Sequence, residues 1–87
     1  MKIKSGFVLR SVAGSYIVVS VGDRVKEFNG VITLNETGGF LWKTLESGAT
    51  EDELVKTLLS EYEVDEDTAK ADVKAFVQKL TDAKLLK

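Results

Sequence analysis

The segment Val31–Trp42 divides this chain into a strand-forming part and a helix-forming part. Before it, β-branched and aromatic residues gather in short runs, and after it apolar residues recur at helical spacing. Asn35 stands at the boundary as an expected helix N-cap, because its side-chain oxygen can accept a hydrogen bond from an early amide of the following helix. Glu36 follows in the first turn, where the helix dipole favours negative charge. Strands followed by helices predict an α+β fold.

Two adjacent glycines, Gly38 and Gly39, lie near the start of that expected helix. Each costs about 1 kcal/mol in a helix interior relative to Ala, so some other interaction must offset the cost. Close packing of the helix against the sheet is the favoured explanation. The alternative is that the glycines keep a neighbouring strand edge open to the backbone of a partner.

Three or four short strands are expected before this helix, at 7–12, 16–21, 24–28 and 31–34. Ala13-Gly14-Ser15 predicts a turn that joins the first two strands as a hairpin. The strand at 24–28 is the weakest, and Asn29-Gly30 after it is typical of a type I′ turn. The sequence leaves open whether 25–28 pairs with 31–34. In the last strand, Ile32 and Leu34 are expected to face inward.

Three helices should follow, the first over about 36–46 and ended by Gly48. Thr50 and Glu53 fit a capping box for the second, and Asp65 is the expected N-cap of the third. A small sheet beside two short helices and a longer one predicts a winged-helix-like arrangement in one domain, 1–87. The closing Leu85-Leu86 is expected to tuck under the sheet. The positions predicted to be buried are Phe40, Leu41, Leu45, Leu54, Val55, Leu58, Leu59, Tyr62, Val73, Phe76, Val77 and Leu80, with Trp42, Ala69 and Ala83 beside them.

Composition argues against catalysis. The chain has no Cys and no His, which excludes thiolate zinc sites and removes the commonest general base. The acidic residues at 61–67 surround a helix start, where capping accounts for them, and no phosphate-binding glycine motif surrounds Gly38. We therefore expect no enzyme, no metal and no cofactor. Apolar runs such as Ile17–Val19 are far too short for a membrane span, so a cytoplasmic location is expected.

Charge argues against nucleic-acid binding. The 12 basic and 14 acidic residues give a net charge of −2, and 51–67 is strongly acidic. The third helix opens with Asp65-Glu66-Asp67 and contains no Arg, whereas a recognition helix needs cations for phosphates and bases. Peptide recognition remains, because a short terminal strand at 31–34 can accept an added strand. That strand could equally be covered by its own neighbour.

The residues also resemble a known family. Phe28–Trp42, with its core Leu34-Asn35-Glu36-Thr37-Gly38, is similar to the signature of the coenzyme pyrroloquinoline-quinone (PQQ) synthesis protein D (PqqD) family, and Glu61–Asp65, Asp72-Val73 and Lys84–Leu86 match as well. The resemblance implies a winged-helix-like recognition element that binds the precursor peptides of ribosomally synthesised and post-translationally modified peptides (RiPPs). Such an element is a non-catalytic chaperone that presents a leader peptide to a modifying enzyme, commonly a radical S-adenosylmethionine (radical SAM) enzyme. The signature is shared by many peptide pathways, so the broad assignment is favoured over PQQ synthesis itself.

In that family the leader adds as a strand to the sheet edge and lies along the third helix. Carried over to this sequence, the resemblance implies a peptide-binding site in which the strand acts mainly through its backbone. Small Ala75 would leave room, and Asp72 and Lys79 would read charges on the leader; an ordinary solvated helix face or core packing is the alternative. A winged-helix nucleic-acid-binding protein and a self-associating adaptor remain alternative functions, and a monomer or weak dimer is expected. The implied site residues are Val31, Ile32, Thr33, Leu34, Asp72, Ala75, Phe76 and Lys79.

Overall fold

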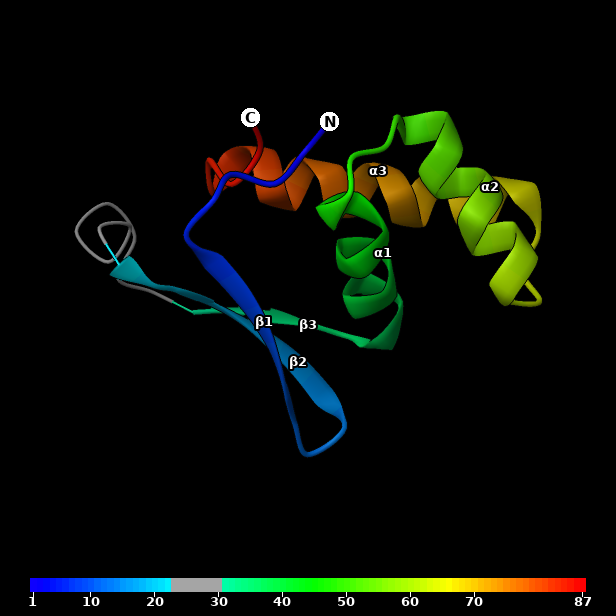
Figure 1. Ribbon diagram of the computed structural model, residues 1–87. Helices are drawn as coiled ribbons and strands as arrows, with labels where there is room; N and C mark the ends of the chain where they lie inside the picture. The colour runs from blue at the N-terminus through cyan, green and yellow to red at the C-terminus, as the bar shows by residue number, and fades with distance from the viewer. Residues whose placement is uncertain (23–30) are drawn as a thin grey trace.

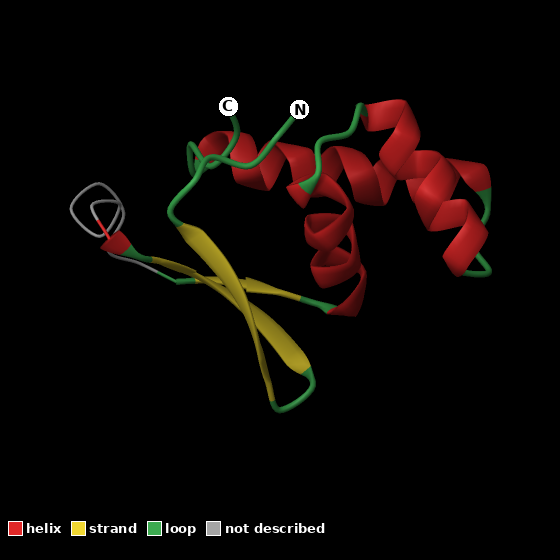
Figure 2. Ribbon diagram, in the orientation of Figure 1, coloured by secondary structure: helices red, strands yellow, loops and turns green. Residues whose placement is uncertain are grey.

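The computed structural model describes residues 1–22 and 31–87 (Figure 1). An antiparallel sheet is followed by helices, as predicted, so the fold class is α+β (Figure 2). The expected strand at 24–28 and the Asn29-Gly30 turn lie outside the described residues. The elements are β1 (Phe7–Val12), β2 (Ser15–Ser20), β3 (Ile32–Leu34), α1 (Glu36–Glu46), α2 (Glu51–Glu61) and α3 (Glu66–Asp82).

β1 and β2 form the predicted hairpin. Val12 pairs with Ser15, so Ala13 and Gly14 are the two turn residues. Both have positive φ, 48° and 83° respectively. A two-residue turn of this kind matches the right-handed twist of the strands that it joins. Ser15, expected in the turn, is the first residue of β2.

β3 lies at one edge of the described sheet, whose strand order is β1-β2-β3. It pairs antiparallel with β2 through Thr33, opposite Ile17, and through the residues on either side. Ile32 and Leu34 are buried and Thr33 is exposed, which confirms the predicted inward orientation of the first two. The second side of β3 has no strand partner among residues 1–22 and 31–87.

All three predicted helix caps are present. The Asn35 side chain accepts a hydrogen bond from the Gly38 amide at 2.8 Å at the start of α1. Thr50 and Glu53 form a complete capping box at the start of α2. Asp65 caps α3. Each cap satisfies an amide that would otherwise lack an intrahelical partner.

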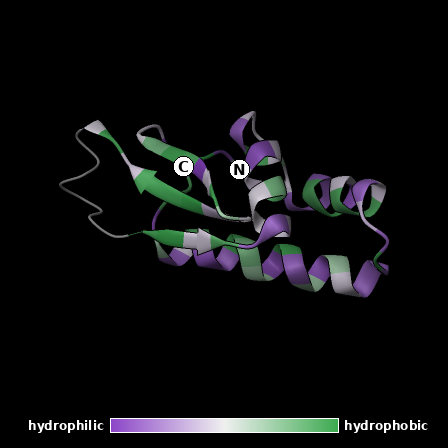
Figure 3. Cartoon of the chain, turned by 90° about the horizontal axis from the view of Figure 1, so that it is seen from below, coloured by the Kyte–Doolittle hydropathy of each residue, from purple (hydrophilic) through white to green (hydrophobic). Residues whose placement is uncertain are grey.

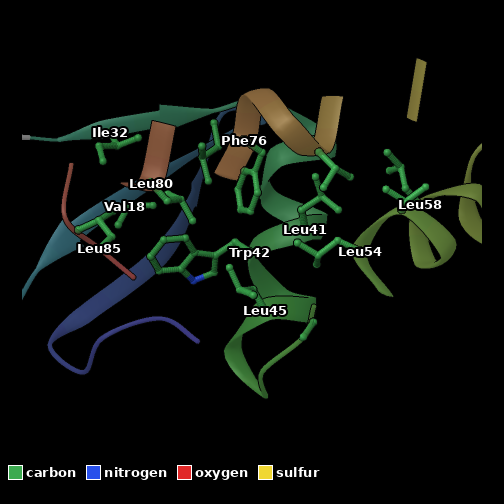
Figure 4. Packing of buried hydrophobic residues seen from close by; sticks show 14 of the residues in the cluster. Val18, Ile32, Leu41, Trp42, Leu45, Leu54, Leu58, Phe76, Leu80 and Leu85 are labelled. Carbon is green, nitrogen blue, oxygen red and sulfur yellow. The ribbon is translucent and has the colours of Figure 1, made fainter. Parts of the chain in front are cut away.

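The core lies between the sheet and the helices and is centred on Trp42, which is 1% exposed (Figure 4). Phe40, expected to lead the buried face of α1, is only half-buried and packs edge-on against Tyr62, with ring centroids 5.5 Å apart. Leu59, predicted to be buried, is 36% exposed. The predicted apolar stripe of α2 is wider than the face that this helix buries. The buried hydrophobic residues are Val18, Ile32, Leu34, Leu41, Trp42, Leu45, Ala49, Leu54, Val55, Leu58, Ala69, Val73, Phe76, Leu80 and Leu85.

The two ends of the chain lie side by side at the top of Figure 1. Ile3 forms an isolated antiparallel bridge with Leu86, and the Lys4 amide donates to the Leu85 carbonyl at 2.8 Å. Leu85 is fully buried and lies near Val18 of the sheet (Figure 4), which agrees with the expected inward position of this segment. These contacts fix the end of α3 relative to the sheet.

The hydropathy of the helices is mixed along their length, whereas the strands are mostly hydrophobic (Figure 3). This is the pattern of helices that bury one face against a sheet. No helix in the described part of the chain is long and apolar enough to cross a membrane.

Candidate functional site

A pocket of about 240 Å³ lies where the end of β3, the first turns of α1 and the middle of α3 meet. Leu34 at the end of β3 forms one side of the pocket, and α3 is linked to the neighbouring Thr33 by a hydrogen bond from Lys79. We call this pocket the β3–α3 groove. It is lined by Leu34, Asn35, Thr37, Gly38, Leu41, Asp72, Ala75, Phe76 and Lys79.

The four α3 positions implied by the resemblance all line the groove. Asp72, Ala75, Phe76 and Lys79 are spaced so that they fall on one side of the helix, since residues three, four and seven apart share a face. Phe76 is buried, and the other three are exposed. The groove therefore has an apolar floor on this side, with a carboxylate and an ammonium group at its rim.

The four strand positions implied by the resemblance do not all line the groove. Leu34 lines the groove, and Ile32 is buried in the core beside it. Val31 is 60% exposed and does not line the groove. Thr33 is reached from α3, because the Lys79 ammonium donates a hydrogen bond to its backbone carbonyl at 2.8 Å. The strand and the helix flank are thus brought together, although they are far apart in the sequence.

The wall formed by α1 was not among the expected site residues. Asn35, Thr37, Gly38 and Leu41 all contribute to the groove. The signal was available, since α1 starts directly after β3 and its first turn must lie at the end of the strand edge. From the sequence, Asn35 was assigned a capping role and Leu41 a core position, and Gly38 was assigned close packing, with an open strand edge as the alternative.

The two glycines have different surroundings. A Cβ atom on Gly39 would lie within 2.7 Å of Cε2 and Cγ of Tyr16, so α1 packs against β2 more closely than any side chain allows. This confirms the packing explanation for Gly39. A Cβ on Gly38 would lie 3.1 Å from Cβ of Leu34, and this glycine lines the groove. Gly38 keeps the junction between strand and helix narrow.

The backbone of Thr33 faces the open side of β3. Its carbonyl accepts from Lys79 on α3 and therefore points away from β2. In an antiparallel strand the N–H and C=O groups of one residue point to the same side, because paired residues exchange both bonds. The Thr33 amide accordingly faces the open side too. One donor and one acceptor are thus presented at the strand edge next to the groove.

The charged groups of the described residues are all at the surface. Hydrogen bonds from the backbone amide of each cap partner hold the pKa of Glu53 and of Asp65 below their ordinary values. Burial, and secondarily the charge of Glu36, raises the pKa of Tyr62. These shifts follow from capping and packing. Within 1–22 and 31–87, no cluster of three or more acidic side chains is arranged to hold a metal ion.

Comparison with known proteins assigns the family. The family model described as coenzyme PQQ synthesis protein D (PqqD) matches residues 8–86. The chain belongs to the PqqD family. This confirms the resemblance seen in the strand-to-helix segment and its downstream motifs. Among curated proteins, no relative of this PqqD-family chain was found.

Two solved structures are similar to this PqqD-family chain over nearly its whole length. One is TbiB1 in complex with the TbiA(beta) leader peptide, with 25% sequence identity, a TM-score of 0.78, and coverage of 100% of this chain and 95% of that chain. The other is lasso peptide synthetase B1 complexed with the leader peptide, with 19% identity, a TM-score of 0.74, and coverage of 99% and 95%. The second likeness supports the fold alone.

Proposed function

We propose that this PqqD-family chain is a recognition element that binds the leader segment of a ribosomally synthesised precursor peptide. The leader adds as a strand to the open edge of β3 and places side chains in the β3–α3 groove. The observation that carries the proposal is the position of the Thr33 backbone, whose donor and acceptor face the open side beside an apolar groove. Strand addition uses such an edge for affinity and adjacent pockets for specificity. The TbiB1 structure, solved with a leader peptide, supports the same use of the fold.

The groove supplies the specificity in this proposal. Phe76 and Leu41 offer apolar surface to a leader side chain, and exposed Ala75 leaves space above the helix. Asp72 and Lys79 stand seven residues apart on α3, which corresponds to about 10 Å along a helix and about three residues along a strand. A basic leader residue would complement the Asp72 carboxylate, whereas the Lys79 ammonium is already bonded to the Thr33 carbonyl. Within β3, Thr33 acts through its backbone, whose amide and carbonyl face the open side, while Ile32 and Leu34 are buried.

The bound leader is then presented to a peptide-modifying enzyme, for which a radical SAM enzyme is the proposed class. The chain itself is proposed to be non-catalytic, to use no cofactor, and to work in the cytoplasm as a monomer or weak dimer. The likeness to TbiB1, solved with a leader peptide, supports the broad role in peptide recognition over a role restricted to PQQ synthesis.

Amide chemical-shift mapping tests the proposal. The probe is a synthetic leader peptide of a candidate precursor from the same genome, and the control is the same peptide with its sequence scrambled. We expect shifts at 31–35 and on the α3 flank that carries Asp72, Ala75 and Lys79, with little change in α2. A leader that saturates no site, or that shifts α2 but neither β3 nor α3, would show that the proposed function is wrong.

A further inference from the structure

One contact in the groove links two residues that are 46 positions apart in the sequence. The Lys79 ammonium donates to the Thr33 carbonyl at 2.8 Å. Both side chains are exposed, and Lys79 stands on the groove rim one turn beyond Phe76. The contact is made by a long, flexible side chain that reaches from α3 to the strand edge.

The Thr33 carbonyl oxygen, which accepts the hydrogen bond from Lys79, is also the acceptor that an added strand would need. A strand pairing with β3, in either direction, must donate an amide to the carbonyls that face the open side. Within the three residues of β3, Ile32 and Leu34 alternate with Thr33, so Thr33 alone presents its backbone to that side. The Lys79 side chain crosses the space that the backbone of an added strand would fill. Binding and the lysine contact are therefore in competition.

We propose that Lys79 guards the β3 edge: its ammonium holds the Thr33 carbonyl in the peptide-free protein, and a leader must displace it to bind. This inference rests on the proposed function and adds a regulatory step to the same site. Lysine on an edge strand's open side is a known means of preventing edge-to-edge association. Here the lysine is supplied by the neighbouring helix. The guard keeps β3 closed to other strands, including β3 of a second copy.

The two possible roles of Lys79 predict opposite changes in leader affinity when the lysine is replaced. A guard lowers affinity, so its removal tightens leader binding. A lysine that only pairs with a leader carboxylate raises affinity, so its removal weakens binding. The exposed contact is weak and easily exchanged, which suits a residue that must yield to the correct peptide.

The test compares Lys79→Met, which keeps most of the side-chain length without the charge, with the wild type. Lys79→Ala removes the stem as well and controls for new apolar contacts made by Met. Lys74→Met is the matched control, since Lys74 is exposed on α3 but does not line the groove. With the same candidate leader peptide labelled with fluorescein, we expect both Lys79 variants to bind about three- to tenfold more tightly and Lys74→Met to bind like the wild type. Equal or weaker binding by the Lys79 variants would overturn the guard.

Two measurements without peptide separate the guard from the proposed function. The ¹³C′ chemical shift of Thr33 should move in Lys79→Met and not in Lys74→Met, because only the first loses the bond to that carbonyl. Sedimentation at increasing concentration should show stronger self-association for Lys79→Met. If the wild type binds no leader, the proposed function fails, and these two readouts still decide the guard. An unmoved Thr33 carbonyl would show that the contact is not formed in the free protein.

Discussion

Replacement of Thr33 by Pro tests strand addition at a single backbone position. Pro removes the amide donor and places its ring where the added strand would approach. Because the Thr33 amide faces away from β2, the substitution spares the hydrogen bonds between β2 and β3, and proline is tolerated on the open side of an edge strand. It also favours extended backbone at the preceding residue, as β3 already has. We therefore expect Thr33→Pro to fold.

The expected loss of leader affinity follows from the bonds that Pro removes. A neutral backbone hydrogen bond contributes about 0.5–1.5 kcal/mol, and a leader carbonyl left without its donor costs about 1–3 kcal/mol. A net loss of roughly 1.4–2.8 kcal/mol corresponds to about 10- to 100-fold in the dissociation constant. Fluorescence anisotropy with a labelled leader peptide measures this directly. Thr33→Val is the control, since it changes the side chain and retains the amide, and it should bind nearly like the wild type.

Two results would refute this reasoning. If Thr33→Pro melts like the wild type and binds the leader with unchanged affinity, the leader does not pair with β3. If Thr33→Val loses as much affinity as Thr33→Pro, the side chain and not the backbone makes the contact. A thermal melt of each variant, followed by circular dichroism, ensures that the comparison is between folded proteins.

Three further predictions concern the groove, the helix–sheet junction and acid stability. Ala75→Leu should fill the groove and weaken leader binding about tenfold or more with little change in melting temperature, whereas Ala71→Leu, on an exposed part of α3 outside the groove, should leave binding unchanged. Gly39→Ala should lower the free energy of unfolding by about 1–3 kcal/mol in a urea titration, because the added Cβ overlaps the Tyr16 ring. This overlap outweighs the gain of about 1 kcal/mol in helix propensity. A free energy of unfolding equal to or above that of the wild type would contradict the close packing. The pKa of Asp65 is lowered in the folded state from its ordinary value of 3.8, so its contribution to stability is complete above about pH 4 and is lost as the pH falls through the folded value. Asp65→Asn should therefore reduce the loss of melting temperature between about pH 4 and pH 2, and an unchanged acid profile would assign that loss to other groups.

The sequence predicts the helix starts because each cap is a local interaction. Asn35, Thr50 and Asp65 each bond to an amide three residues later, so the acceptor and the donor can be found in one short segment. The hairpin turn at Ala13-Gly14 is local for the same reason. Boundaries set by such contacts agree with the structure to within about a residue.

Burial was predicted less well where the packing partner is distant in sequence. Periodicity alone gives Phe40 the same weight as Leu41, yet the position of β2 and α3 decides that Trp42 enters the core and Phe40 stays half-buried. The same limit applies to Leu59. The sequence predicted that the helix packs closely on the sheet at Gly39. It did not identify Tyr16 as the residue that Gly39 contacts.

The site was predicted in part for a related reason. The family resemblance implies the α3 flank, and the structure places those four residues around one groove. The first turn of α1 was missed, because its residues have local roles in capping and packing that account for them without a site. The contact of Lys79 with Thr33 joins a helix to a strand across most of the chain, and no local pattern indicates it.

Because β3 is short, most of the free energy of leader binding must come from the groove. With three residues, and with Thr33 alone facing the open side, β3 offers an added strand one pair of backbone hydrogen bonds. Such a pair contributes about 1–3 kcal/mol, whereas micromolar binding needs about 8 kcal/mol. The remaining 5–7 kcal/mol or so must come from side chains, which at about 25 cal/mol per Å² requires the burial of at least 200–280 Å² of apolar surface before the costs of association are counted. That area is of the order of one or two large apolar side chains. Affinity should therefore depend on what the leader places against Leu41, Ala75 and Phe76, while the strand edge fixes its register.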